Sequence, residues 1–329
     1  MTQIVLLQTF LVGLGAGAAA ALLFASVTSG MLLSVFLFYL APLPIMIAAL
    51  GWSHWAGIVA AITAATSLGL FFGILFFVAF LAGVAAPAWW LGYLVLLGRA
   101  APNGGGGHLE WYPPGRLVLW AAILGALVVT GGLAGLGGDE ETIHTSLHAA
   151  LDHIFRLQSG LGTDEPLRFP GIEDPDRLIE LFAIALPPMA AVIATATQMF
   201  NLWLAGQIVR LSGRLRRPWP DLNAMSFPAP AAALLPIAVA GALIPGVAGM
   251  ISSLFAATLA VAFAILGFAF LHAVTRHLRG RAMLLTGAYA IVGILGWPVL
   301  VIALVGLFET VFRWRARMDK RGPPVVPGG

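Results

Sequence analysis

Apolar and polar stretches alternate along almost the whole chain, and the apolar ones are long. A helix needs roughly 20 apolar residues to cross a bilayer. Eight stretches approach or reach this length: residues 4–25, 31–50, 56–72, 74–97, 117–136, 179–206, 231–247 and 250–274. They lack the period-two alternation of membrane-barrel strands, so they predict helices, which pair their own backbone groups. We expect an all-α, polytopic transmembrane helix bundle with about 8–10 membrane segments.

A ninth apolar run, residues 282–308, has basic residues on both flanks. A single span there would put these flanks on opposite sides of the membrane. The run contains Gly-Trp-Pro at 296–298, and proline interrupts a helix. This predicts a hairpin of two short halves; the alternative is a re-entrant, proline-rich segment 228–247. The run 56–97 is also too long for one helix, and we expect its break near residues 67–69.

Composition supports a membrane environment. Of 329 residues, 60% are apolar and only 9% are charged, whereas soluble domains carry about a quarter charged residues. The first 98 residues contain no Asp, Glu, Lys or Arg. The N-terminus lacks the basic region of a signal peptide, so residues 4–25 are interpreted as a retained first span. The absence of cysteine excludes disulfides, thiol catalysis and Cys-based metal sites.

The few charges are unevenly distributed. Residues 138–180 hold ten acidic and three basic residues, and the rest of the chain holds four acidic and fourteen basic ones. Short basic loops stay in the cytoplasm. Because five spans precede the acidic segment, we expect a bacterial inner-membrane protein with a cytoplasmic N-terminus. The predicted division is a five-span N-terminal membrane half (1–137), an acidic extracytoplasmic insert (138–178), a C-terminal membrane half (179–317) and a disordered cytoplasmic tail (318–329).

Four arginines follow the sixth span within eight residues: Arg210, Arg214, Arg216 and Arg217. We interpret them as a topology signal whose side chains reach anionic lipid head groups on the cytoplasmic side. A nucleic-acid site is not favoured, because neither interleaved aromatic residues nor a known binding motif accompanies them. The bilayer is therefore the predicted partner of this segment.

Within the acidic insert, residues 140–158 place apolar side chains at helical spacing with polar groups between them. This pattern predicts an amphipathic helix on the outer membrane surface or across the end of the bundle. His144, His148 and Asp152 recur every four residues, so they share one face of that helix. The main interpretation is the hydrophilic side of an interfacial helix, and the alternative is a metal site. We expect no cofactor.

Polar and ionisable groups at membrane depth are candidates for ligand binding. The candidates here are Gln198, Asn201, His272 and Glu309. The first two suit hydrogen bonds between helices, and His272 also suits ordinary packing. Glu309 precedes Arg313 by four residues, so a helical ion pair is the alternative to a binding role.

Small residues recur every fourth position on the first span, at Gly13, Gly17 and Ala21. Such a ridge lets another helix approach closely, either within the bundle or from a second membrane subunit. The sequence has no HExxH or GxSxG motif and no paired catalytic carboxylates. We therefore expect a protein that is not an enzyme.

Three stretches resemble the YybS-like membrane proteins, a family of unknown function: APLPIMIAALGWSHWAGIVAA (41–61), ILGFAFLHAVTRHLRG (265–280) and LVGLFETVFRWRAR (304–317). Glu309 stands where that family's C-terminal motif is expected to have aspartate. The resemblance extends over residues 4–317.

That family is in turn distantly similar to the membrane-embedded substrate-binding subunits of energy-coupling-factor vitamin transporters. This likeness implies a helical binding bundle whose first helix docks a membrane partner. The docking residues would be Gly13, Gly17 and Ala21, or Ala16 and Ala20. It implies nothing about the identity of a substrate.

Two functions are compatible with these features. The favoured one is a small-molecule-binding or transport-related membrane subunit, and the alternative is a non-transporting scaffold or envelope assembly factor. A binding subunit should contain a shielded cavity with converging polar groups. A scaffold should be packed throughout and should expose an apolar patch for its partner.

Overall fold

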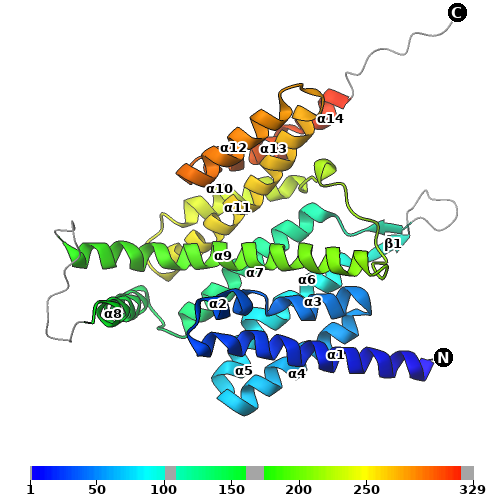
Figure 1. Ribbon diagram of the computed structural model, residues 1–329. Helices are drawn as coiled ribbons and strands as arrows, with labels where there is room; N and C mark the ends of the chain where they lie inside the picture. Colours follow the sequence, from blue (N-terminus) through cyan, green and yellow to red (C-terminus); the bar gives the residue numbers. More distant parts are fainter. Residues whose placement is uncertain (1, 101–108, 161–173, 320–329) are drawn as a thin grey trace, which may run out of the picture.

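The protein is a bundle of helices (Figure 1) in a computed structural model that describes residues 2–100, 109–160 and 174–319. Within these ranges, seven helical segments are long and apolar enough to cross a membrane. This confirms the all-α transmembrane fold. The small departure from it is a two-stranded antiparallel hairpin, β1 (Gly98–Ala100) and β2 (Leu109–Trp111).

The first four passes form the N-terminal half of the bundle. They are α1 (Thr2–Ala25) with the short η1 (Ser26–Ser29), then α2 (Leu32–Tyr39) with α3 (Pro42–Gly51), then α4 (His54–Phe72), and finally α5 (Ile74–Phe80), η2 (Leu81–Ala85) and α6 (Ala86–Val95). Their shared core is rich in alanine: Ala20, Ala56, Ala60 and Ala64 have no exposed surface. Small side chains let these helices pack closely.

Backbone chemistry explains where these passes are interrupted. Pro42 separates α2 from α3, because proline cannot donate the helical hydrogen bond. The predicted division into spans 56–72 and 74–97 is confirmed, but the break lies at Gly73 and not near residues 67–69. α4 continues to Phe72, and Gly73 has a φ of 93° that favours glycine. A π-helical turn, η2, precedes Pro87 and relieves the loss of its hydrogen bond.

Two long helices stand between the two halves, α7 (Pro114–Ala134) and α9 (Pro175–Leu211) (Figure 1). α9 stays helical through Pro187 and Pro188, and its 37 residues correspond to about 56 Å at 1.5 Å per residue. It therefore extends beyond the bundle at one end, where it carries α8.

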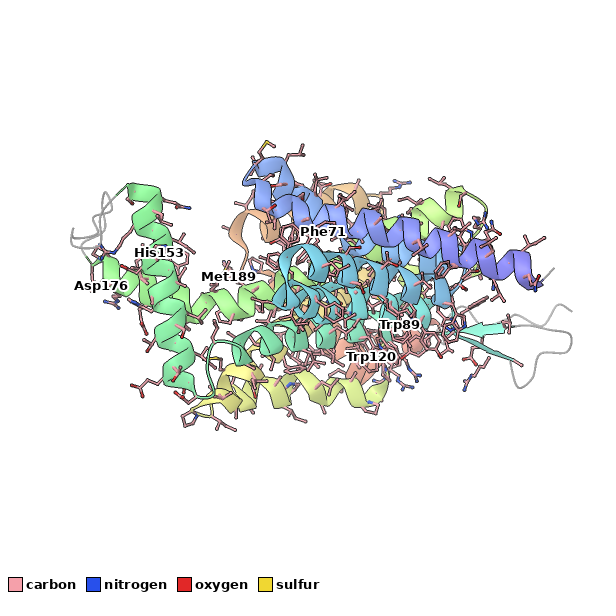
Figure 2. All side chains as sticks on the ribbon, turned by 90° about the horizontal axis from the view of Figure 1, so that it is seen from below. Phe71, Trp89, Trp120, His153, Asp176 and Met189 are labelled. Carbon is pink, nitrogen blue, oxygen red and sulfur yellow. The ribbon has the colours of Figure 1, made fainter. Side chains whose placement is uncertain are left out.

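The amphipathic helix of the insert is confirmed as α8 (Glu140–Ser159). Leu151 packs against Ile179 and Ala183 of α9. Figure 2 shows α8, with His153 on it, lying across the end of the bundle. Residues 161–173 of the insert lie outside the described residues.

The C-terminal half is made of shorter and more interrupted elements. They are η3 (Leu222–Ala224), η4 (Ala229–Ala233), α10 (Leu234–Gly241), α11 (Val247–Val274), η5 (Thr275–His277), α12 (Arg281–Leu295), α13 (Val299–Phe312) and α14 (Trp314–Asp319). The predicted hairpin at 282–308 is confirmed, because Gly296 with a φ of 72° separates α12 from α13. The predicted eighth span at 231–247 is wrong as a continuous helix, because α10 has only eight residues and follows a 3-10 turn.

Two observations show at which end of the bundle the turns of the C-terminal half lie. Gly246, in the turn between α10 and α11, donates to Glu140 at 2.7 Å and so lies at the α8 end. Arg276 and Arg313, after α11 and near the end of α13, lie beside Arg116 at the other end. The basic residues that flank the 282–308 run therefore lie at the same end of the bundle, as expected if α12 and α13 form a hairpin. The four-part division of the chain stays a prediction, and residues 320–329 of the predicted tail lie outside the described residues.

Candidate ligand-binding site

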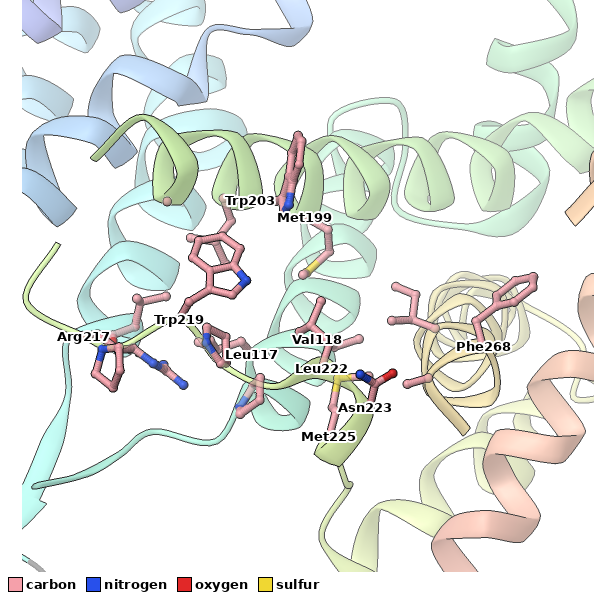
Figure 3. Close-up of a pocket in the computed structure, with 18 of the residues that line it drawn as sticks. Leu117, Val118, Met199, Trp203, Arg217, Trp219, Leu222, Asn223, Met225 and Phe268 are labelled. Atoms are coloured by element: carbon pink, nitrogen blue, oxygen red, sulfur yellow. The ribbon is translucent and has the colours of Figure 1, made fainter. Parts of the chain in front are cut away.

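A cavity of about 580 Å³ lies between α7, α9, α11 and the segment that follows α9 (Figure 3). Its volume is within the range of small-molecule sites, about 300–1,000 Å³. Its walls are mostly apolar, and include Leu117 and Val118 from α7, Met199 and Trp203 from α9, and Phe268 and Ala269 from α11. We call it the apolar cavity.

The segment after α9 leaves this space open because of its own sequence. α9 ends at Leu211, followed by Gly213 with a φ of 70° that favours glycine. Pro218 and Pro220 then disfavour a new helix, and the chain crosses the cavity. Between them, the Trp219 ring lies against Gly206, where an added Cβ would come within 3.3 Å of the ring. The Arg210 guanidinium stacks over the same ring at 5.2 Å. Trp219 is therefore fixed as one wall.

Polar groups enter the apolar cavity at few points. His272 Nε2 and the Tyr289 hydroxyl are 2.9 Å apart, which joins α11 to α12. Trp203 and Tyr289 are about half exposed, at 48% and 47%, and so mark the rim of the cavity. Of the four predicted binding residues, His272 is the one in this cavity.

The arginine cluster holds helix ends together. Arg214 donates to the carbonyl of Gly51, the last residue of α3, at 3.3 Å and lies 4.2 Å from the Trp52 ring centre. Arg217 donates to the carbonyl of Val95, the last residue of α6, at 3.2 Å. Cations are favourable at the negative, carboxyl end of a helix.

These contacts correct the expectation that all four arginines reach lipid. Arg217 is buried, with 7% exposed, and burial lowers the pKa of its guanidinium. Arg216 donates to the Trp52 carbonyl at 3.4 Å. Their role as a topology signal stays a prediction. A pattern of charges along the chain does not reveal carbonyl partners that lie more than a hundred residues away.

A second cavity of about 730 Å³ lies at the basic end of the bundle. We call it the basic cavity. Its charged and titratable lining residues come from α7, η3, η5, α13 and the turn to α14: Arg116, Asp221, Arg276, His277, Glu309, Arg313 and Arg315. With His277 neutral, four arginines oppose two carboxylates, which leaves an excess of two positive charges.

Glu309 lies in the basic cavity, but its predicted pairing with Arg313 is wrong. Its Oε1 accepts from Arg315 Nε at 2.8 Å. α13 ends at Phe312, and Arg313 adopts left-handed backbone angles, φ 49° and ψ 49°. This turn removes Arg313 from the helix face that carries Glu309 and folds Arg315 back toward it.

Arg315 also holds the segment between the two cavities. Its Nη1 donates to the Asn223 carbonyl and its Nη2 to the Met225 carbonyl, the latter at 2.7 Å. Glu309 is 6% exposed, and its Oε2 has no hydrogen-bond partner among the described residues. Sequence reasoning did not identify Arg315 as the partner of Glu309, because this pairing depends on the left-handed turn at Arg313.

Gln198 and Asn201 lie outside both cavities. Asn201 Nδ2 donates to the Tyr39 carbonyl at 2.8 Å, which confirms a hydrogen bond between helices. Tyr39 is the last residue of α2, and the break before Pro42 frees its carbonyl. Gln198 is buried, and its Oε1 has no partner among the described residues.

The residues proposed as a metal site on α8 do not come together as one. His144 Nε2 lies 3.3 Å from a Glu180 carboxylate oxygen, and Asp152 pairs with Arg156 at 2.7 Å. His148 is on the same helix. In the described ranges, no group of three or more His, Asp or Glu side chains has an arrangement that could hold a metal ion.

The small-residue ridge of α1 faces α4. An added Cβ at Gly13 would come within 2.6 Å of Val59, and one at Gly17 within 2.6 Å of the Ala60 carbonyl oxygen. Ala21 is 8% exposed. The ridge is thus occupied inside the chain, and docking of a second subunit on another face of α1 stays a prediction.

A profile of the family described as "Predicted membrane protein (DUF2232)" matches residues 18–310. This range includes both halves of the bundle and the lining residues of both cavities up to Thr310. No curated protein and no solved structure matches the chain. The likeness to subunits of energy-coupling-factor transporters is supported by none of these comparisons.

Proposed function

We propose a ligand-binding function for this chain, which belongs to the DUF2232 family of predicted membrane proteins. It holds a largely apolar small molecule within the membrane, as part of a binding or transport process. The observation that carries the proposal is the apolar cavity, bounded by α7, α9, α11 and the Trp219 segment. In a solid scaffold, side chains would fill this volume, since protein interiors are normally close-packed.

The cavity favours binding over the scaffold alternative. Scaffolds need an outer contact surface and gain nothing from an internal space. The site is also better suited to binding than to catalysis, because apolar side chains predominate and the polar groups at its edge already pair with each other.

The binding proposal can be tested with monolauroylglycerol, a neutral probe with one hydrocarbon chain, on purified protein in detergent. A ligand specific for the folded state adds about 2.7 kcal/mol to the free energy of unfolding at 100 times its Kd. We expect Ala269→Phe, which places a ring in the cavity, to weaken binding about tenfold by titration calorimetry. Ala290→Phe on the exposed face of α12 is the matched control. If the unmodified protein binds neither this probe nor its phosphate analogue, lauroyl lysophosphatidic acid, the proposal is refuted.

We further propose that the chain lies in the bacterial inner membrane, with its N-terminus and the arginine-rich end in the cytoplasm. The clustering of Arg116, Arg217, Arg276 and Arg313 at one end of the bundle supports this orientation. Reporter fusions after residues 160 and 220 should report the outside and the cytoplasm, respectively. Two fusions on the same side would contradict it.

A further inference from the structure

The apolar and basic cavities are separated by one short stretch of chain, residues 221–226. Its residues divide between them: Leu222 and Met225 line the apolar cavity, whereas Ala224 and Ser226 line the basic cavity. Asn223 lines both. The two spaces are therefore neighbours that adjoin at Asn223.

The basic cavity has the composition of an anion site. In the described part of the chain, the side chains of Arg276 and Arg313 form no ion pair. Arg116 approaches the Tyr112 ring at 5.9 Å and also interacts electrostatically with Glu110, which is already paired with Arg99. Arginine donors recognise phosphate oxygens well, because the guanidinium offers several N–H groups in one plane. Asp221 is engaged locally, where its Oδ1 accepts from the Asn223 backbone N–H at 3.0 Å.

The buried carboxylate of Glu309 adds a second requirement. Arg315 neutralises it through Oε1, but Oε2 remains without a donor at 6% exposure. A buried acceptor without a partner costs free energy. A ligand that offers a hydroxyl or ammonium group near its anionic group would supply that donor.

The position of the two cavities matches the layout of a bilayer. The basic cavity lies where α7 begins and where α11 and α13 end, which is the membrane interface of the bundle. The apolar cavity extends from there along α9 and α11. Trp203 and Tyr289, half exposed on α9 and α12, lie on the rim of this cavity and face outward from the bundle.

We infer that the two cavities form one binding site for an amphiphile. Its phosphate-type head group, with a neighbouring hydroxyl or ammonium donor, occupies the basic cavity, and its hydrocarbon chain occupies the apolar cavity. This inference rests on the proposed function and names the ligand class of the same site. A free phosphate compound and a membrane lipid share the head-group chemistry, so the test must separate them.

Three probes separate the contributions: lauroyl lysophosphatidic acid, monolauroylglycerol and glycerol 3-phosphate. The first has the chain, the hydroxyl and the phosphate, the second lacks the phosphate, and the third lacks the chain. We expect the first to bind at least about tenfold more tightly than either of the others, because charge-assisted hydrogen bonds add to chain burial. Detergent micelles take up the two lauroyl probes to different extents, so each Kd is corrected for the probe's own micelle partition before the ratio of the two Kd values is taken.

Variants test which cavity binds the phosphate group and which binds the hydrocarbon chain. Arg276→Gln with Arg313→Gln should raise the Kd of lauroyl lysophosphatidic acid about tenfold or more and leave that of monolauroylglycerol unchanged. Arg279→Gln removes a nearby charge that lines neither cavity and is the control. Ala269→Phe should weaken both lauroyl probes. The melting temperature of each variant without ligand shows that it is folded.

The outcomes are distinguishable. If monolauroylglycerol binds as tightly as its phosphate analogue, or if the double arginine variant changes nothing, the amphiphile inference fails while the binding function stands. If glycerol 3-phosphate binds as tightly as the full amphiphile, the site takes a soluble phosphate compound and the inference also fails. If no lauroyl probe binds, both the inference and the proposed function fail.

Discussion

The two halves of the bundle use glycine in the same way but differ in what surrounds it. In the N-terminal half, Gly13 and Gly17 bring α1 against α4, and the adjoining core is a continuous set of alanines and larger side chains. In the C-terminal half, Gly267 and Gly306 bring α11 even closer to α13. An added Cβ at either would come within 2.0 Å of a backbone oxygen, against 2.6 Å from the nearest atom at Gly13 and Gly17. Beside that contact, however, α12 has Leu285 as its one buried residue, and both cavities open nearby.

This contrast bears on where the proposed ligand would lie. Small residues at every fourth position give α1 a continuous, close contact with α4. Prolines and short 3-10 turns interrupt the C-terminal elements, so their side chains cannot fill the volume between α7, α9 and α11. Under the proposed function, the packed N-terminal half serves as a support, and the ligand lies between α7, α9 and the C-terminal elements.

The largest effect should come from the C-terminal half. Arg315→Gln leaves the Glu309 carboxylate buried without its partner, and we expect a loss of about 3–5 kcal/mol in the free energy of unfolding. Adding Glu309→Gln removes that charge and should recover part of the loss. Denaturant unfolding in detergent measures both, with Arg317→Gln on the exposed part of α14 as the control. A loss no greater than that of the control would show that the ion pair is not structural.

A smaller effect is expected in the packed half. Gly13→Leu and Gly17→Leu each force α1 away from α4 and should cost roughly 1–3 kcal/mol by overpacking. Gly15→Leu is the matched control, because an added Cβ there meets nothing within 4 Å. Melting temperatures in detergent should fall for the first two variants and stay unchanged for the third. Equal melting of all three would contradict the internal role of the ridge.

The smallest effect concerns the helix that both halves share. Asn201→Leu removes the hydrogen bond to the Tyr39 carbonyl and should cost about 1 kcal/mol, typical of polar contacts between membrane helices. Gln198→Met, one turn away, removes a buried oxygen without a described partner and should cost nothing or stabilise slightly. If the two substitutions have the same effect on thermal unfolding, this distinction between the residues is wrong.

The sequence predicted the helices well because bilayer crossing imposes one simple requirement, apolar length. It also predicted the break at Pro298, since proline has a fixed backbone chemistry. It misplaced the break after α4, because the backbone angle that selects Gly73 over Gly69 depends on packing. It overestimated the span at 231–247, because hydropathy does not distinguish a continuous helix from a 3-10 turn followed by a short one.

The site was predicted only in part. His272 and Glu309 stood out as ionisable groups in apolar surroundings, and the structure places one in each cavity. The cavities are formed by helices and loops that are distant in sequence, so no local sequence pattern predicts them. Arg276 was recognised as a charge next to a membrane span but not as a residue that lines the basic cavity, because hydropathy does not show which ends of the spans lie together.

The contacts of α9 with the N-terminal half, including the hydrogen bond from Asn201 to Tyr39, also affect when that half can finish folding during synthesis. The N-terminal core includes Leu202, Ala205 and Val209 of α9, so it is incomplete when α6 ends at Val95. Ribosomes add about 5–20 residues per second, so α9 reaches the membrane roughly 5–20 s after α6. During that interval the Tyr39 carbonyl has no protein donor from α9, and the slot for α9 must be held by lipid, by α7 or by the insertion machinery. The N-terminal half is therefore synthesised first but finished late.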